Sequence, residues 1–290
     1  MDGILIINKP KNYTSHDIVY KIKNIVNEKV GHTGTLDPLA TGVLPLLIGK
    51  GTLCSKYLID HDKIYQVELK LGMKTTTADS EGKLIEEKEV LSEMLEEDKV
   101  KQVLETFLGK QSQIPPIYSA IKVNGKKLYE YARNNQKVEI KSRNIEIYKI
   151  KLIKIDKKEK ILKFEVKCSK GTYIRSLCED IAQRLNTVGY MYNLNRIQVG
   201  AFDISNAISI EEIQENENPK EILEKHLITI EEIFDSKENI EVNERKLQLF
   251  LNGVKLTYNK KDEIYKIYNE NKFIGTGVIK NNLLKRDIVI

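Results

Sequence analysis

The sequence predicts an α+β protein with a mixed, largely antiparallel sheet in its main part and a small β-rich module at its C-terminal end. Stretches that alternate apolar and polar residues, as half-buried strands do, are interspersed with stretches of helical periodicity. The two kinds do not alternate regularly, which argues against a parallel βαβ sheet. After Phe234 the chain changes to short alternating runs. We therefore expect one domain over residues 1–234 and a second over residues 235–290.

The first predicted elements are a helix and a strand. Residues 14–29 predict a helix, because their apolar residues recur on one helical face behind a Thr or Ser cap. Residues 63–73 alternate, with Tyr65, Val67 and Leu69 on the apolar side, and predict a half-buried strand.

The next elements are two helices that enclose a hairpin. A charged helical stretch ends in residues 100–109 and is expected to stop at Gly109. Residues 145–156 and 161–169 both alternate around a short charged turn, which predicts an antiparallel hairpin. The spacing of apolar residues then predicts a helix over residues 171–185, with Thr172 as its N-cap. The terminal module is expected to contain strands within residues 246–253, 264–279 and 287–290.

Composition excludes several classes of protein. The 290 residues carry 47 Lys plus Arg and 42 Asp plus Glu, a net charge of +5, with 31% charged residues. The longest unbroken apolar run, residues 43–48, is far shorter than the ~20 residues that a membrane-spanning helix needs. The N-terminus lacks the pattern of a signal peptide. We expect a cytoplasmic protein without a membrane partner, and the modest basic surplus fits an RNA partner without requiring one.

No motif indicates a metal or a cofactor. The three cysteines form no CxxC pair, and the four histidines show no HxH or HxxxH spacing. The glycines after Gly42 do not have the Walker A spacing, and residues 275–277 lack the third glycine of a dinucleotide fingerprint. We therefore expect a protein with no metal and no cofactor.

The densest group of candidate residues is the loop GHTGTLDPLATGVLPL, residues 31–46. Its glycines and prolines disfavour regular helix and allow another backbone to come close. Asp37 precedes Pro38, which favours an extended conformation that holds the carboxylate away from the chain. An aspartate there is either a nucleophile or an ordinary turn residue, and its spacing alone favours the turn.

Three further residues are candidates, and each has a structural interpretation that needs no function. Arg175 lies in the first turn of a predicted helix, where it either binds an anion or is a solvated surface residue. Tyr65 is on spacing alone a core residue. His32 is more often a hydrogen-bonding loop residue than a catalytic one.

Six blocks of the sequence closely resemble the TruB family of pseudouridine synthases, over residues 3 to about 210. The blocks are ILIINKPKNYTSHDIV (4–19), GHTGTLDPLATGVLPLLIG (31–49), KIYQVELKLGMKTTTADSEG (63–82), QIPPIYSAIKVNGKKLYEYAR (113–133), CSKGTYIRSL (168–177) and LNRIQVGAF (194–202). The resemblance implies the pseudouridine synthase fold with a C-terminal PUA-like RNA-binding domain. It also implies isomerisation of uridine to pseudouridine at position 55, in the T-loop of tRNA.

By the same resemblance, three residues carry the chemistry. Asp37 matches the catalytic aspartate, Tyr65 the tyrosine that stacks on the target base, and Arg175 the arginine that pairs with the aspartate. The carboxylate could attack C1′, attack C6 or assist glycal formation, and all three routes need it ionised.

Further residues match positions that bind substrate or lie beside the site. His32 matches the histidine that fills the gap left by the flipped base, and Tyr173 and Leu194 match pocket residues. Asp79 matches an acidic partner of the arginine, and Lys9 belongs to the NKP motif near the site.

The resemblance implies tRNA, through its T stem-loop, as the partner of a monomer that uses no guide RNA. A guide-dependent synthase of the same superfamily and an RNA-binding module without catalysis are the rival interpretations. The first would need a longer C-terminal domain, and the second would fit a chain that lacked Asp37. Two departures from the family pattern, Thr76 and Asn195, concern peripheral RNA contacts.

Overall fold

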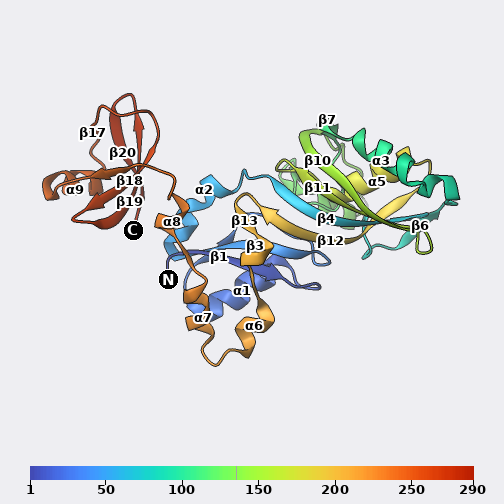
Figure 1. Cartoon of the computed structure of the whole chain (residues 1–290), viewed down its shortest axis with the longest axis horizontal. Helices are drawn as coiled ribbons and strands as arrows, with labels where there is room; N and C mark the ends of the chain where they lie inside the picture. The colour runs from blue at the N-terminus through green and yellow to red at the C-terminus, as the bar shows by residue number, and fades with distance from the viewer. Residues whose placement is uncertain (135) are drawn as a thin grey trace.

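The computed structural model describes residues 1–134 and 136–290 and shows an elongated α+β molecule (Figure 1). Its described residues form two large sheets and two two-stranded ones. Within these residues, the larger sheet has eleven strands. Its main path runs through β14 (Ile208–Ser209), β1 (Gly3–Lys9), β3 (Thr41–Ile48), β12 (Gly189–Val199), β4 (Lys63–Leu71), β11 (Ile161–Cys168), β10 (Arg143–Asp156) and β7 (Gly109–Gln113). Beside this path, β2 (Val30–His32) pairs with β3, β13 (Phe202–Asp203) with β12, and β15 (Ile228–Thr229) with β1.

Most neighbouring strands of this sheet are antiparallel. Parallel pairs occur between β1 and β14 and between β3 and β12. The predicted mixed, largely antiparallel sheet is therefore confirmed, and so is the hairpin, which β10 and β11 form.

The principal helices of the main part pack against this sheet. They are α1 (Ser15–Val26), α3 (Glu97–Glu105) and α5 (Ile174–Arg184). Helix α5 packs on β12 and β4, while α3 contacts α5 and β10. Helix α5 follows β11 in the chain, and its contacts with β4 and β12 place it over the middle strands of the sheet. The smaller helices are α2 (Ser55–Leu58), α4 (Leu128–Arg133), α6 (Ile210–Glu215), α7 (Pro219–Lys225) and α8 (Ile230–Ile233), with the 3₁₀ turns η1 (Gly49–Cys54), η2 (Ser92–Leu95) and η3 (Ile204–Asn206).

Helix boundaries follow local capping chemistry. Thr14 caps α1, as predicted: it accepts from the backbone N–H of Asp17, whose carboxylate accepts from the N–H of Thr14. Helix α3 ends at Glu105 and not at Gly109, because Gly109, with a φ of +89°, already begins β7. The predicted N-cap of α5 was wrong, since Tyr173 occupies that position and the Thr172 hydroxyl donates to the carbonyl of Ser169.

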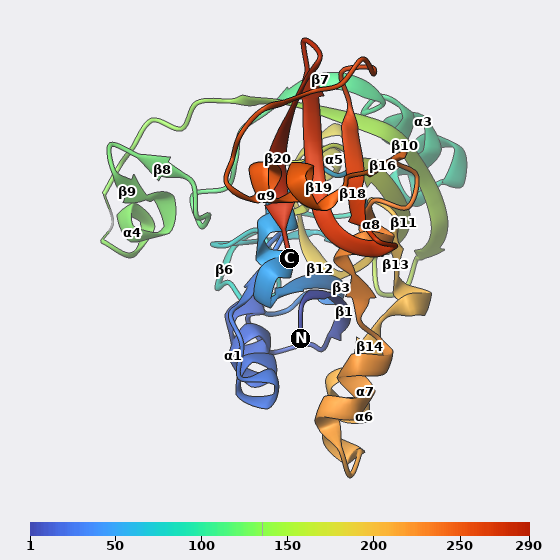
Figure 2. The ribbon, with the colours of Figure 1, turned by 90° about the vertical axis from the view of Figure 1, so that its left-hand side faces the viewer.

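Two small hairpins extend from the main sheet. One is β5 (Met73–Thr75) with β6 (Leu84–Glu87). The other, β8 (Lys122–Val123) with β9 (Lys126–Lys127), projects with α4 away from the body of the molecule (Figure 2). We call residues 122–134 the projecting module.

The C-terminal module has its own five-stranded sheet. In spatial order it contains β16 (Asn239–Glu241), β18 (Ile264–Asn269), β19 (Lys272–Lys280), β20 (Leu283–Val289) and β17 (Leu256–Thr257). The expected strand within residues 246–253 was wrong, because these residues belong to helix α9 (Glu244–Leu251). The β-rich character of this end of the chain is confirmed.

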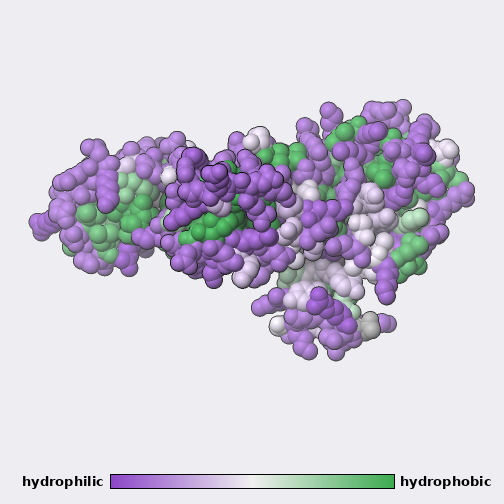
Figure 3. Space-filling model, turned by 90° about the horizontal axis from the view of Figure 1, so that it is seen from below, coloured by the Kyte–Doolittle hydropathy of each residue, from purple (hydrophilic) through white to green (hydrophobic). Residues whose placement is uncertain are grey.

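The C-terminal module shares an apolar cluster with the main part. Phe273 and Ile288 pack there with Cys54, Leu58 and Phe234. The face seen from below is mostly hydrophilic, the C-terminal module at its left end included (Figure 3). Among the described residues, no helix is both long and apolar enough to span a membrane.

Candidate active site

A cavity of about 720 Å³ opens over the middle of the large sheet, beside the N-terminal end of α5. Its other walls include the loop between β2 and β3, strands β4 and β12, residues 118–120, and Tyr129 of α4. Five of the predicted site residues line it: Asp37, Tyr65, Tyr173, Arg175 and Leu194. Segments distant in sequence thus meet at one cavity because β4 and β12 are neighbours in the sheet.

Hydrogen bonds fix the loop that carries Asp37 on both sides of that residue. Ser15, buried at the start of α1, accepts from the backbone N–H of Leu36 at 2.8 Å and donates to its carbonyl at 3.2 Å. The carbonyl of Pro38 accepts from the backbone N–H of Asn12 at 2.9 Å and from Lys9 Nζ at 3.2 Å. Residues on both sides of Asp37 are therefore fixed, and its carboxylate has a defined place at the cavity.

Arg175 pairs with Asp37 at the floor of the cavity. Its Nε atom lies 3.1 Å from Oδ2 of Asp37, and its Nη2 atom lies 3.5 Å from Oδ1. Nη2 also donates to the carbonyl of Tyr118 at 2.9 Å. The Arg175 side chain is only 8% exposed, which excludes the interpretation as a solvated surface residue.

Asp79 lies behind Arg175 and away from the cavity. Its Oδ2 atom is 3.5 Å from Nη1 of Arg175, and its side chain is 5% exposed. Oδ1 accepts from the Thr77 hydroxyl at 2.5 Å and from the backbone N–H of Glu81 at 3.1 Å. The guanidinium of Arg175 is thus held between two carboxylates, of which only Asp37 lines the cavity.

Burial dominates the electrostatics of Asp37. The desolvation of its carboxylate raises the pKa above the ordinary value of 3.8, and Arg175 and Lys9 oppose this shift while Asp79 adds to it. The pKa of Asp37 therefore depends on two opposing effects: desolvation, which raises it, and the charge of Arg175, which lowers it.

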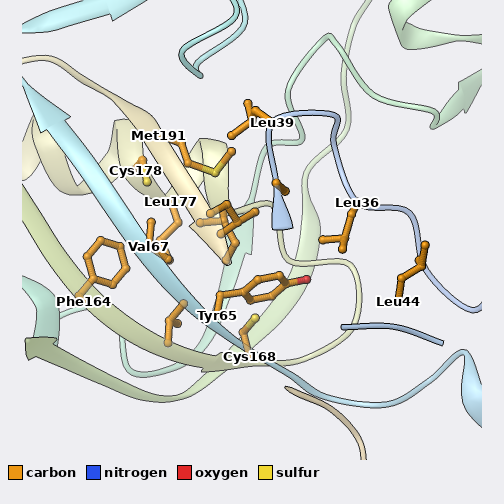
Figure 4. Close-up of a cluster of buried hydrophobic side chains, with 14 of the residues drawn as sticks. Leu36, Leu39, Leu44, Tyr65, Val67, Phe164, Cys168, Leu177, Cys178 and Met191 are labelled. Atoms are coloured by element: carbon orange, nitrogen blue, oxygen red, sulfur yellow. The ribbon is translucent and has the colours of Figure 1, made fainter. Parts of the chain in front are cut away.

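Tyr65 reaches from β4 toward Leu36 of the Asp37 loop (Figure 4). The side chain is 7% exposed, and burial raises the pKa of the phenol to about 12. Tyr65 belongs to the apolar core and also lines the cavity. The two interpretations of this residue are therefore compatible, and its ring is held rigidly by the core.

Arg196 is a site residue that the sequence analysis did not single out. It lies opposite Tyr65 on β12, lines the cavity and is 1% exposed. Its Nε donates to the carbonyl of Val43 at 2.8 Å and its Nη2 to the carbonyl of Gly34 at 3.1 Å. Arg196 thereby joins both ends of the Asp37 loop to the sheet. The available signal was its rarity, because the chain has only seven arginines.

Besides Asp79, two of the predicted residues, Lys9 and His32, do not line the cavity. Lys9 is fully buried, and its ammonium group donates to the carbonyls of Pro10, Tyr13 and Pro38. Burial lowers its pKa to about 8. Lys9 therefore has a structural role, because its hydrogen bond to Pro38 fixes the Asp37 loop. His32 lies on β2 with a buried Nδ1 atom that has no hydrogen-bond partner among the described residues, and burial lowers its pKa.

Two buried hydroxyls also line the cavity. Thr33 and Ser119 are each 6% exposed, and neither hydroxyl has a hydrogen-bond partner among the described residues. Buried polar atoms are usually satisfied, so these two unpaired hydroxyls beside the cavity are exceptions.

Family models match most of the chain. The model described as "TruB family pseudouridylate synthase (N terminal domain)" matches residues 22–174, and "tRNA pseudouridylate synthase B C-terminal domain" matches residues 175–235. The boundary between the two falls directly before Arg175, so Asp37 and its partner arginine lie in different models.

Close relatives share nearly the full length of the chain. It is 43% identical over 289 residues to tRNA pseudouridine synthase B of Clostridium kluyveri, covering 97% of this chain and 96% of the relative. It is 44% identical to tRNA pseudouridine synthase B of Caldanaerobacter subterraneus subsp. tengcongensis, covering 98% of each.

Solved structures share the fold at lower identity. A chain of a Cbf5-Nop10-Gar1 complex superposes with a TM-score of 0.67 and 24% identity, covering 99% of this chain and 83% of that one. A chain of an H/ACA RNP bound to a substrate RNA containing 2′-deoxyuridine gives 0.68 and 21%, covering 99% and 85%.

Proposed function

Because the chain belongs to the TruB family of pseudouridylate synthases, we propose that it isomerises the uridine at position 55, in the T-loop of tRNA, with Asp37 as the catalytic carboxylate. The observation that carries this proposal is the contact between Asp37 and Arg175 at the floor of the cavity. The Asp37 side chain is 35% exposed and so only partly desolvated, and Arg175 favours its ionised form by offsetting that desolvation.

The reaction requires access to an atom that a stacked RNA loop conceals. The N1–C1′ bond must break, the uracil must rotate, and C5 must join C1′ before the C5 proton leaves. The nucleotide must therefore leave the stack, at a cost of a few kcal/mol. A cavity of about 720 Å³ is large enough for a nucleoside.

The cavity walls suit a uracil ring. Tyr65 offers an aromatic ring, and Leu194 and Tyr173 add apolar surface. Asp37 then lies beside the base, where attack at C1′, attack at C6 and glycal formation all use the ionised carboxylate.

Basic residues outside the cavity fit an RNA backbone. The projecting module carries Lys122, Lys126 and Lys127, and Tyr129 lies between Lys127 and Arg133 in cation–π geometry. A phosphate backbone is recognised by such charges, and their contribution falls with salt. The C-terminal module, which we assign as PUA-like, would extend this RNA surface.

We further propose that the chain acts in the cytoplasm as a monomer without guide RNA. Its relatives, which it matches almost from end to end, are named tRNA pseudouridine synthase B, and we extend a tRNA substrate from them to this chain.

The purified chain alone should release tritium from C5-labelled uridine in a T-arm stem-loop. The matched control is a stem-loop with labelled uridine elsewhere and cytidine at the target position, which should release none. Absence of release from the first substrate, with a folded protein that binds the RNA, would reject the proposed reaction. Dependence on an added RNA would reject guide-free action.

A further inference from the structure

Gln113 makes a two-point contact with the backbone of Tyr173, 60 residues further along the chain. The Gln113 side-chain carbonyl accepts from the Tyr173 N–H at 2.8 Å, and its amide nitrogen donates to the Tyr173 carbonyl at 3.0 Å. Gln113 is 4% exposed. The pair is therefore shielded from water, and both functions of the amide are used.

This contact fixes the point at which α5 begins. Tyr173 is the N-cap residue of α5 and has no side-chain cap of its own. Its N–H lies outside the helical hydrogen-bond pattern and needs an external partner. Gln113 supplies it from the end of β7, so the large sheet positions the first turn of α5.

The first turn of α5 carries two residues of the cavity. Tyr173 lines it directly, and Arg175 follows two residues later with its Nε 3.1 Å from Asp37. Two further contacts join α5 to the chain segment that begins at Gln113: Ser176 Oγ donates to the Ile114 carbonyl at 2.9 Å, and Arg175 Nη2 donates to the Tyr118 carbonyl at 2.9 Å. A displacement of Tyr173 would therefore also move Arg175 relative to Asp37.

We propose that Gln113 is a positioning residue for the isomerisation, because its amide holds the backbone of Tyr173 and thereby places Arg175 against Asp37. This inference rests on the proposed function. Gln113 does not line the cavity, so it acts through Tyr173 and Arg175 and not by touching the base.

Gln113→Glu tests the hydrogen-bond pattern through pH. A protonated carboxyl group reproduces the amide pattern, since its carbonyl accepts and its O–H donates. The ionised form only accepts, and it faces the Tyr173 carbonyl with a lone pair. The ratio of variant to parent single-turnover rate should therefore rise at least ~10-fold as the pH falls and the glutamate becomes protonated. The ratio is compared at pH values above the acid limb of the parent protein, where Asp37 is ionised in the parent.

Gln113→Leu removes both hydrogen bonds without adding a charge. We expect its single-turnover rate at saturating RNA to fall ~10–100-fold at every pH, with the Kd for RNA changed less than ~3-fold. Faster hydrogen exchange at the Tyr173 amide should accompany this loss, and that readout does not depend on activity. The matched controls for the two variants are Gln111→Glu and Gln111→Leu, because Gln111 lies on the same strand and donates to the Phe107 carbonyl.

The outcomes separate the two proposals. An inactive parent protein would reject the proposed function, while exchange at the Tyr173 amide would still test the contact. An active parent with a pH-independent Gln113→Glu ratio, or an unchanged rate in folded Gln113→Leu, would overturn the positioning role. A lower Tm with a full single-turnover rate would show that Gln113 only stabilises the fold.

Discussion

The Nε atom of Arg175 lies 3.1 Å from Oδ2 of Asp37, although 138 positions separate the two residues in the chain. Asp79 contacts the same guanidinium from the other side, at 3.5 Å. Arg175 is therefore oriented between two carboxylates, and a planar, forked cation suits this task better than a point charge.

Replacing Arg175 by lysine should separate orientation from charge. We expect Arg175→Lys to lower the single-turnover rate at saturating RNA by ~100-fold, because loss of the planar contacts displaces Asp37 by a fraction of an ångström to about 1 Å. The Kd for RNA should change little, since the side chain is buried. Rapid-quench kinetics and filter binding measure the two quantities.

The matched control for this substitution is Arg184→Lys. Arg184 lies on the same helix, is exposed and bonds to Thr106, outside the cavity. A weakened Kd with a preserved single-turnover rate in Arg175→Lys would instead assign Arg175 to phosphate binding.

The activity should show an acid limb set by Asp37. Burial raises the pKa of Asp37 above 3.8, so the carboxylate takes up its proton at a higher pH than an exposed aspartate. The single-turnover rate should fall as the pH decreases through this raised pKa. Because Arg175 lowers the pKa of Asp37, Arg175→Gln should move the acid limb to higher pH, in addition to lowering the rate.

The pH dependence of single-turnover rates on a short stem-loop measures the acid limb of the parent protein and that of Arg175→Gln. Circular dichroism at each pH shows that the proteins remain folded. A limb that stays in place or moves to lower pH in Arg175→Gln would contradict the assignment of the titrating group.

The sequence predicted the site residues through motifs and not through spacing. By periodicity alone Asp37 was a turn residue and Tyr65 a core residue, and only the resemblance gave them roles. Gln113 and Arg196 had no such role, because their importance depends on contacts between strands and helices far apart in sequence. Local patterns contain no information about which strand lies beside which.

The sheet was predictable because half-buried strands alternate, whereas the errors arose where two periodicities compete. In residues 246–253, Leu247, Leu249 and Leu251 alternate like a strand, but Leu247 and Phe250 are the residues buried, at helical spacing. The decisive signal was Asn243, which caps α9 by accepting from the N–H of Lys246.

Asp287 should stabilise the junction between the C-terminal module and the main part. Its carboxylate accepts from the Tyr57 hydroxyl at 2.5 Å and from the Thr276 hydroxyl at 3.0 Å, and it pairs with Lys56. Asp287→Ala leaves the Tyr57 hydroxyl without this partner, which costs about 1–3 kcal/mol. Calorimetry should show a Tm lower by about 2–10 °C.

The chemistry of RNA-bound protein should be nearly unaffected in Asp287→Ala, because the junction does not line the cavity. Asp262→Ala is the control, since Asp262 is an exposed carboxylate of the same module that accepts from the Asn281 N–H. An unchanged Tm, or a collapsed single-turnover rate at saturating RNA, would refute this role of Asp287.

Lys122 and Lys126 of the projecting module, which do not line the cavity, should contribute affinity and not chemistry. We expect the double variant Lys122→Ala and Lys126→Ala to bind a T stem-loop more weakly, with the slope of log K against log salt reduced by about two. Its single-turnover rate at saturating RNA should stay within about threefold of the parent. Filter binding at several salt concentrations measures the slope.

The control for these lysines is the double variant Lys99→Ala and Lys101→Ala. Both residues are exposed on α3, where they pair with Glu93 and Glu97. Equal salt slopes in the two double variants would show that the projecting module does not contact the RNA backbone.

The central claim is that the carboxylate of Asp37 carries the isomerisation, and Asp37→Asn tests it most directly. The substitution keeps the shape of the side chain and removes its charge, so the cavity and the RNA surface should remain. Tritium release from C5-labelled uridine in the T stem-loop should fall at least ~1000-fold, equivalent to about 4 kcal/mol of activation free energy, while the Kd stays within about threefold. Turnover comparable to the parent protein, in a preparation checked by mass spectrometry for deamidation back to aspartate, would contradict the account.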